Sequence, residues 1–356
     1  MFWPDRDSVN GLDILIAGCG TNQAALLAYT NPSARIVAID ISEPSLDHQR
    51  SLKIKYGLDN LELRLLPIEE IQSLGLEFDL IVSTGVLHHM RDPLVGLKAL
   101  AGCLRVDGTV AIMLYGHYGR IGVEMLQDIF KDMSFSQDDV SVRVVKDALA
   151  SLPQSHPVKM YLERAHDLNS DAGIVDTFLN GRERSYTGDQ ALNIVESSGL
   201  VFVDWFFKSL YYPIASSNAF EASVALLPLK KQWSIMERFS ARAGGHYFTA
   251  CRADRPELSY RIDFQSERFL DYLPSLRHLC KLEGTKLSRH DDWSVALDQN
   301  QLAILLLVDG NHTIREILAE PIEIQVASME QYARELFESL WKLDFLMVGL
   351  RSNPKI

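Results

Sequence analysis

Leu12-Asp13-Ile14-Leu15-Ile16-Ala17-Gly18-Cys19-Gly20-Thr21-Asn22-Gln23 is the stretch that decides the fold. Residues 12–17 are mostly apolar, as in a buried parallel strand, and two glycines end this run before an apolar helical segment at residues 24–29. Because glycine has no Cβ, the backbone can turn sharply at Gly18 and Gly20 and approach a ligand closely. The pattern predicts a strand, a tight glycine loop and a helix.

A second buried strand is predicted over residues 35–40, and it ends in the carboxylate of Asp40. At this place in a β-α-β unit, an acid accepts hydrogen bonds from both ribose hydroxyls of an adenosine. Two glycines alone are a weak signal, but the flanking strand and helix and the acid together predict a site for a nucleoside-containing cofactor. The plainer alternatives are a solvated acid at Asp40 and a small buried filler at Cys19.

Composition limits the architecture and the kind of partner. The chain has 356 residues, of which 47% are hydrophobic, and this is enough for about two domains with buried cores. No apolar run approaches the ~20 residues of a membrane span, and the first residues lack the basic and apolar segments of an export signal. The net charge of −12 argues against nonspecific attraction to nucleic acid or anionic lipid. The four cysteines are far apart, which predicts no metal site and no disulfide framework, and we expect a cytoplasmic protein.

A third strand is predicted over residues 61–66, followed by a loop. In this position a loop can place apolar atoms against an adenine ring, so Leu66, Pro67 and Ile68 are candidates for that contact. Ordinary loop packing is an equally good explanation of the same residues.

The fourth strand, residues 78–83, runs into a turn that contains His88 and His89. An Asp-Pro pair then begins a helix, and a fifth strand is predicted over residues 109–114. The paired histidines therefore follow the carboxyl end of a strand, where open α/β sheets bind ligands.

Residues 14–22, Asp40 and residues 78–93 together resemble a class I S-adenosylmethionine-dependent methyltransferase. The resemblance is to the group whose fourth strand runs into a "VLHH" turn before an Asp-Pro helix start, and it covers residues 12 to about 115. It implies a Rossmann-like α/β fold with a seven-stranded sheet.

The resemblance also implies which residues bind S-adenosylmethionine. Asp40 would hold the ribose, Pro67 and Ile68 would flank the adenine, and the glycines would bring backbone close to the methionine part. Ser83 and Thr84 would face the sulfonium. The full set of implied cofactor-binding residues is Gly18, Cys19, Gly20, Asp40, Ile41, Pro67, Ile68, Ser83 and Thr84.

Two positions of the glycine loop depart from the family pattern. Ile16 stands where the family usually has an acid that helps to hold the amino group of the cofactor, so that contact must be supplied otherwise, for example by the backbone of Gly18 or Ser83. Asn22 stands where a third glycine is usual, and asparagine tolerates the left-handed conformation better than most residues.

Methyl transfer is an in-line displacement on an activated carbon, so positioning of the two reactants supplies much of the rate. A base is needed only for a protonated acceptor, and His88, His89 and His117 are the candidates, because histidine titrates near neutrality. Structural explanations are a loop hydrogen bond for His88 and packing under the following helix for His89. Tyr115 and Tyr118 are candidates for orienting the acceptor.

A long helical insertion is predicted over residues 122–190. We expect it to cover the site, because only a short segment precedes the first strand. Its tail contains Arg182, Arg184 and Tyr186, and the arginines suit an anionic acceptor or the carboxylate of the cofactor. A solvated surface turn is the alternative for this tail.

Two domains are expected, a methyltransferase domain over residues 1–256 and a small α+β domain over residues 257–356. Strands at residues 201–206 and 247–252 complete the seven of the first domain. Three predicted helices and a short strand give the second domain a winged-helix-like pattern. It is acidic and lacks a basic recognition helix, so we expect contact with a protein partner or a second copy and no binding to nucleic acid or membrane.

The function favoured by the sequence is methyl transfer from S-adenosylmethionine to a small-molecule or a peptide or protein acceptor. One alternative is a non-catalytic S-adenosylmethionine-binding scaffold or regulatory subunit, suggested by Ile16 and Asn22. A less favoured alternative is an NAD-dependent oxidoreductase, whose loop would need a glycine in place of Gln23.

Overall fold

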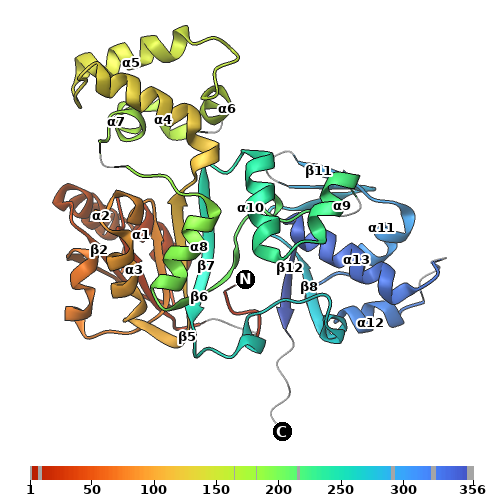
Figure 1. The fold of residues 1–356 in the computed structure, drawn as a ribbon. Coiled ribbons are helices and arrows are strands. Elements are labelled where there is room, and N and C mark those ends of the chain that lie inside the picture. The colour runs from red at the N-terminus through yellow and green to blue at the C-terminus, as the bar shows by residue number, and fades with distance from the viewer. Residues whose placement is uncertain are drawn as a thin grey trace. The chain divides into compact units, whose positions relative to one another are not determined.

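The computed structural model describes residues 2–6, 10–163, 165–181, 183–214, 217–289, 293–321 and 326–350 (Figure 1). The chain divides into two compact units. The sheet unit contains Asp13–Phe202 and Trp233–Arg252, and the second unit contains Met1–Leu12, Val203–Gln232 and Ala253–Ile356. The expected boundary at residue 256 lies close to the point where the chain leaves the sheet unit for the last time. A single cut there does not account for the two earlier segments that belong with the C-terminal residues.

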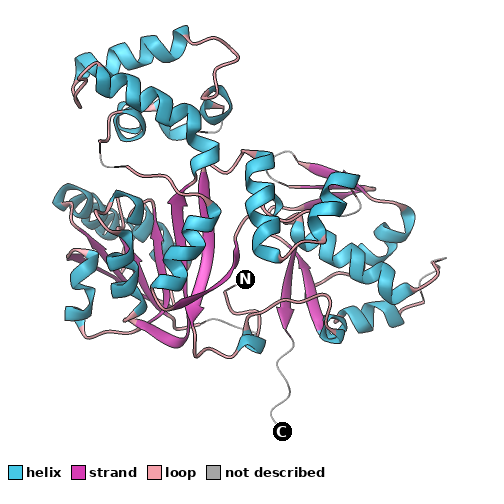
Figure 2. Cartoon of the chain, viewed as in Figure 1, coloured by secondary structure: helices cyan, strands magenta, loops and turns pink. Residues whose placement is uncertain are grey.

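A seven-stranded sheet forms the core of the sheet unit, in the order β3-β2-β1-β4-β5-β7-β6. Figure 2 draws the strands as magenta arrows and the helices in cyan. The pairs β1–β2, β1–β4, β2–β3 and β4–β5 are parallel, and β7 runs antiparallel to β5. The predicted Rossmann-like α/β fold is confirmed. The strands are β1 (Asp13–Ala17), β2 (Arg35–Asp40), β3 (Leu61–Leu65), β4 (Phe78–Thr84), β5 (Leu104–Tyr115), β6 (Leu200–Trp205) and β7 (Gly245–Arg252).

Several helices begin after a residue whose short polar side chain caps the first turn, which is the type of residue that favours a helix start. Ser42, Asp92 and Thr187 each accept a hydrogen bond from a backbone N–H in the first turn, and Thr187 forms a full capping box with Gln190. The helices that accompany the strands are α1 (Gln23–Thr30), α2 (Glu43–Tyr56), α3 (Pro93–Ala101), α8 (Gly188–Ser197) and α10 (Leu229–Ser240), the last of which belongs to the sheet unit from Trp233 onward.

The order of the strands fixes where a ligand can bind. From β1 the chain continues outward to β2 and β3, then returns to place β4 on the other side of β1. In open α/β sheets, the crevice that binds ligands lies at such a switch point, outside the carboxyl ends of the strands, here those of β1 and β4. The glycine loop and the histidine turn lie at this switch point.

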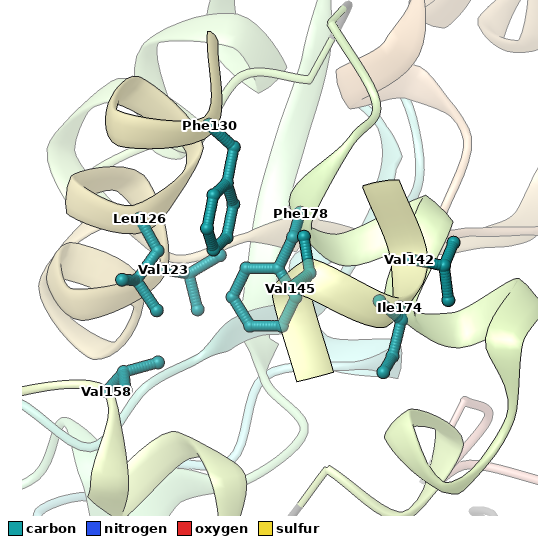
Figure 3. Packing of buried hydrophobic residues seen from close by; sticks show 8 residues of the cluster. All are labelled: Val123, Leu126, Phe130, Val142, Val145, Val158, Ile174 and Phe178. Carbon is teal, nitrogen blue, oxygen red and sulfur yellow. The ribbon is translucent and has the colours of Figure 1, made fainter. Parts of the chain in front are cut away.

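The predicted helical insertion is observed and begins directly after β5. It comprises α4 (His117–Asp132), α5 (Asp139–Ser151), α6 (Lys159–Leu162) and α7 (Asp171–Phe178), and we call these helices the cap. They enclose a core of their own, to which each helix or the loop beside it contributes (Figure 3). The buried residues of this core are Val123, Leu126, Phe130, Val142, Val145, Val158, Ile174 and Phe178.

The two ends of the cap are hydrogen-bonded to each other. The backbone N–H of Tyr186 donates to the carbonyl of Tyr115, and the N–H of His117 donates to the carbonyl of Tyr186, both at 2.8 Å. Gly116 and Tyr186 form a parallel β-bridge at the same place. The cap is thus an excursion that closes on itself where it leaves the sheet.

The second unit contains two small sheets and a set of helices. Strands β8 (Tyr272–Leu276) and β12 (Leu346–Leu350) pair antiparallel, and β9 (Lys281–Glu283), β10 (Lys286–Ser288) and β11 (Ser294–Ala296) form the other sheet. The three predicted helices and the final strand are present, whereas the winged-helix description stays a prediction. The helices of this unit are α9 (Ala219–Ala225), α11 (Gln299–Leu305), α12 (Ile314–Ala319) and α13 (Met329–Lys342).

One buried carboxylate explains why residues 203–232 belong to the second unit. Asp344 is 2% exposed, and its side chain accepts hydrogen bonds from the backbone N–H groups of Lys208 at 3.1 Å and Ser209 at 3.0 Å. It also pairs with the guanidinium of Arg277 at 2.7 Å. Three segments far apart in the sequence meet at this carboxylate, and no local pattern indicates such a contact.

In the part of the chain that the structure describes, none of the helices has both the length and the apolar character that crossing a bilayer requires.

Stability of the cap is expected to depend on its internal core. Val145 is fully buried and Val140, on the same helix, is 62% exposed. Val145→Ala removes two buried methyl groups, at about 0.8 kcal/mol each plus a cavity term, so we expect a loss of roughly 2 kcal/mol in the free energy of unfolding. Val140→Ala is the matched control, with an expected change within ~0.5 kcal/mol. Urea unfolding measures both variants, and equal losses would contradict the assignment of this core.

Candidate functional site

The glycine loop after β1 packs closely against the end of β2 and the turn after β4. The backbone N–H groups of Gly18 and Cys19 both donate to the carbonyl of Ile39, at 2.9 and 3.0 Å. Gly18 has a φ of +79°, and a Cβ on it would lie 2.3 Å from a methyl carbon of Val86 in the turn after β4. Only glycine fits here, because any side chain would push the loop and the turn apart.

Asp40 is fixed at the end of β2 by backbone donors. One carboxylate oxygen accepts the N–H of Gly20 and the other accepts the N–H of Ser42, both at 2.9 Å. Each carboxylate oxygen has a second acceptor position, so the group can still receive hydroxyl donors from a ligand. Ile41 follows it with a side chain that is 76% exposed, which offers an apolar surface beside the carboxylate.

Gln49 of α2 is a functional residue that the sequence analysis missed. Its amide is completely buried and donates to the carbonyls of Gly20 at 3.0 Å and Cys19 at 3.3 Å, while its oxygen accepts the N–H of Ala25 at 3.0 Å. It therefore holds the glycine loop in place from behind. The sequence feature that could have indicated Gln49 is its position three residues after the buried Leu46, which places a polar side chain on the inward face of α2.

Gln23 is a second residue of the crevice. The sequence analysis considered it only as the position where an NAD-dependent oxidoreductase would need a glycine. Its amide nitrogen donates to the hydroxyl of Thr84 at 2.7 Å, and this bond crosses from the start of α1 to the end of β4. The thiol of Cys19, by contrast, is buried, and burial next to Asp40 raises its pKa to about 12. Cys19 is therefore a neutral filler of the loop.

The loop after β3 presents less apolar surface than expected. Ile68 begins a short 3-10 helix, Ile68–Leu74, and is only 6% exposed, so its side chain packs inward. Pro67 is half-buried. It follows Leu66, whose backbone N–H donates to the carbonyl of Asp40 at 3.0 Å, and the exposed Ile41 directly follows Asp40 in the chain.

Several polar atoms at the end of β4 and in the histidine turn are buried and have no hydrogen-bond partner among the residues that the structure describes. They are the hydroxyl of Ser83, both ring nitrogens of His88 and Nδ1 of His89. The His88 ring stacks on Tyr115 with a centroid distance of 3.8 Å. Burial lowers the pKa of His88 to about 3, and it also lowers the pKa of His89. Buried polar atoms normally have partners, so neutral, unpaired groups in a crevice indicate where a polar ligand fits.

Arg120 extends this cluster into the cap. It is 1% exposed, its guanidinium lies 3.8 Å from the centre of the Tyr115 ring, and it pairs with the carboxylate of Glu183. It also donates to the hydroxyl of Tyr161 at 2.6 Å. Tyr115, Arg120 and Tyr161 line a cavity of about 420 Å³. The other lining residues are Met113, Gly119, Met160, Ala165, Arg242, Gly244, Gly245 and Tyr247.

His117 has a different environment from that of the histidine turn. Its Nδ1 lies 3.1 Å from a carboxylate oxygen of Glu124, which also accepts the hydroxyl of Ser185. These three residues, with Gln127, Asp128, Glu183 and Arg184, line a cavity of about 370 Å³. A carboxylate on one ring nitrogen fixes the orientation of the imidazole and leaves the other nitrogen for chemistry.

The remaining predicted acceptor residues lie around the same cap ends. Arg184 is exposed, with its guanidinium 5.3 Å from the centre of the Tyr186 ring. Tyr186 is buried, and its hydroxyl has no hydrogen-bond partner within the described part of the chain. The Tyr118 ring lies 5.1 Å from that of His117. Arg182 lies outside the described residues.

The comparison with known proteins agrees with this geometry. Residues 15–110 match the family model for a methyltransferase domain. This chain carries a class I methyltransferase domain. The resemblance predicted for residues 12 to about 115 is thereby confirmed.

Two curated relatives each match part of the chain. An uncharacterised protein of Synechococcus sp. is 30% identical over 207 residues, which are 56% of this chain and 50% of that protein. A malonyl-[acyl-carrier protein] O-methyltransferase of Acetivibrio thermocellus is 34% identical over 114 residues, which are 32% of this chain and 39% of that protein. The chain thus spans about half the length of the curated relatives that it matches, or less.

A solved structure shares the fold over most of the chain. PKMT2 from Rickettsia typhi, in complex with AdoHcy, superposes with a TM-score of 0.65 and covers 95% of this chain and 71% of that one. The two sequences are 16% identical, so the similarity is one of fold.

A buried histidine and glutamate support the cap ends of the methyltransferase domain. His246 Nε2 lies 2.7 Å from the carbonyl of Tyr186 and is the donor of this bond, because a carbonyl can only accept. Glu237 accepts the backbone N–H of Gly188 at 2.8 Å, and its other oxygen lies 3.4 Å from His246 Nε2. Burial lowers the pKa of His246 to about 4 and raises the pKa of Glu237 to about 7.

The raised pKa of Glu237 gives a pH-dependent contribution to stability. The folded domain holds this proton more tightly than the unfolded chain, so the contribution is complete below about pH 4.5 and is lost as the pH rises through about 7. Glu237→Gln keeps an acceptor for Gly188 but does not ionise. We expect the variant to gain stability relative to the wild type between pH 5 and about 8. Urea unfolding of both proteins across this range tests it, and parallel stability curves would contradict a buried proton on Glu237.

Proposed function

We propose that the protein transfers a methyl group from S-adenosylmethionine to an acceptor held between the sheet and the cap. The observation that carries this proposal is Asp40, fixed at the switch point beside a loop where only glycine fits at Gly18. The unpaired hydroxyl of Ser83 and the exposed Ile41 suit the same cofactor. The AdoHcy bound in the Rickettsia typhi structure of the same fold supports it further.

The proposed cofactor-binding residues contact different parts of S-adenosylmethionine. Asp40 receives the ribose hydroxyls, and Ile41 and Pro67 provide apolar surface for the adenine, while Ile68 supports Pro67 from within the loop. The backbone from Gly18 to Gly20 faces the methionine part, with Cys19 filling the space behind it, and Ser83 and Thr84 lie toward the sulfonium. S-adenosylmethionine supplies an activated methyl group, and the protein contributes the alignment of that group with the acceptor.

His117 is the best-placed base among the three candidate histidines. His88 is buried with a pKa lowered to about 3, and burial lowers the pKa of His89, so both are poor proton acceptors near neutral pH. His117 is partly exposed and oriented by Glu124. We infer that His88 stacks with Tyr115 to shape the site, and that His117 removes the proton of an acceptor that carries one.

The acceptor is proposed to occupy the space around Tyr115. The cavity of about 420 Å³ is lined by tyrosine and methionine side chains, which suit a small molecule or the side chain of a peptide or protein. Arg184, Tyr186 and Tyr118 lie at the cap ends, where Arg184 is available to an anionic group. The net charge of −12 disfavours nucleic acid as the acceptor.

The amino-acid composition supports two further proposals, on the location of the protein and on the partner of its second unit. We propose a cytoplasmic location, because four cysteines that are far apart in the sequence suit a reducing compartment. The second unit is proposed to contact a protein partner or a second copy, because the sequence of residues 257–356 offers no basic helix for nucleic acid.

Asp40 tests the cofactor. We expect S-adenosylmethionine and S-adenosylhomocysteine to bind the wild type in the micromolar range, and Asp40→Ala to weaken both by roughly tenfold to a hundredfold, because hydrogen bonds to a charged group are lost. Asp47→Ala, at an exposed carboxylate on α2, is the control and should bind as the wild type does. Calorimetric titration measures all three proteins. Binding of NAD alone would replace the methyltransferase proposal with an oxidoreductase.

His117 tests the base. With an acceptor found by screening small molecules and peptides for transfer of labelled methyl, His117→Asn should lower kcat by about a hundredfold and leave the KM for S-adenosylmethionine unchanged. Glu124→Gln should give a smaller loss in the same direction, and His48→Asn, at an exposed histidine of α2, should give none. An unchanged kcat in His117→Asn would mean that the acceptor reacts without a base from this residue.

A further inference from the structure

The described residues 14–30 and 80–90, around the ends of β1 and β4, contain no Asp, Glu, Lys or Arg for the amino-acid end of the proposed cofactor. Their polar groups are hydroxyls, amides, the buried imidazoles of His88 and His89, and a thiol that burial keeps neutral. Ile16 is fully buried within β1. An ammonium and a carboxylate placed here must therefore be met by neutral hydrogen-bonding groups.

Gln23 is the neutral group that spans this crevice. β1 and β4 are neighbours in register at Ile16 and Val82, and the Gln23 side chain bridges the segments that follow these two strands by its bond to Thr84. That bond uses one of the two amide hydrogens and so fixes the orientation of the amide. In the described part of the chain, this bond leaves the second N–H and the carbonyl oxygen of Gln23 available to a ligand, and Gln23 is only half-buried.

The N-terminus of α1, which begins at Gln23, favours the binding of a carboxylate. α1 has no acidic residue in its first turn, and its N-cap residue Asn22 makes no side-chain capping bond. The side chain that accepts a backbone N–H of this first turn is the neutral amide of Gln49, at Ala25, and the Asp40 carboxylate bonds before the helix, at Gly20. The first turn itself therefore holds no carboxylate that would offset the positive end of the helix dipole. A carboxylate near the Gln23 amide would gain from this field.

We propose that Gln23 binds the amino-acid end of S-adenosylmethionine, with its carbonyl oxygen accepting from the ammonium and its free N–H donating to the carboxylate. An amide can serve both groups of an amino acid, whereas a carboxylate can serve only the ammonium. Gln23 thereby supplies the contact that Ile16 cannot make. This assignment rests on the proposed cofactor and adds a residue to its site.

Calorimetry with two ligands separates this role from a general effect on the fold. S-adenosylhomocysteine carries the amino-acid end, and 5′-methylthioadenosine lacks it. Gln23→Leu should weaken S-adenosylhomocysteine by about tenfold and leave 5′-methylthioadenosine unchanged. Asp40→Ala should weaken both ligands, and Thr30→Val, at a hydroxyl that bonds only within α1 and its C-cap, should weaken neither.

The outcomes distinguish failure of this inference from failure of the proposed function. Equal weakening of both ligands in Gln23→Leu, or no weakening of either, would overturn the role of Gln23 while leaving the cofactor in place. If the wild type binds neither ligand, the cofactor itself is wrong. Gln23→Glu is a second test, because glutamate keeps an acceptor for the ammonium but repels the carboxylate. Its affinity for S-adenosylhomocysteine should therefore fall below that of the wild type. An increase in this affinity would contradict donation by Gln23 to the carboxylate.

Discussion

The close approach of Gly18 to Val86 is the constraint on which the candidate site depends. It brings the loop after β1 against the turn after β4, and no other residue fits at Gly18 without displacing one of them. The two segments are then joined again by the bond from Gln23 to Thr84 and held from behind by Gln49. The crevice at the switch point is therefore shaped before any ligand enters, and little ordering has to occur on binding.

The sequence predicted those parts of the fold that depend on local chemistry. The strands, the glycine loop and the helix starts at Ser42, Asp92 and Thr187 follow from apolar periodicity and capping, which act over a few residues. The unit to which residues 203–232 belong could not be predicted in this way, because it is set by the distant carboxylate of Asp344. Contacts between residues far apart in the chain produce no periodic pattern in the sequence from which they could be predicted.

The same distinction applies to the candidate site. Asp40 and the glycines belong to a local motif and were identified as cofactor candidates, but Gln49 and Arg120 act through partners in other elements. The three histidines were equivalent in the sequence and differ in the structure, because burial lowers the pKa of His88 and His89 while Glu124 orients His117. Environment, which residue type does not reveal, decides which of them is suited to take a proton.

The hydrogen-bonded base of the cap has a consequence for how such a chain can diversify. Since Tyr115 and Tyr186 are already joined, the residues between them form a loop whose ends are closed by the sheet itself. The entropy of closing a loop rises slowly with its length, by about 0.6 kcal/mol for each doubling, so insertions or replacements within the cap cost the domain little. The cap can therefore be exchanged while the strands and loops at the switch point remain as they are, and under the proposed function such an exchange would change the acceptor.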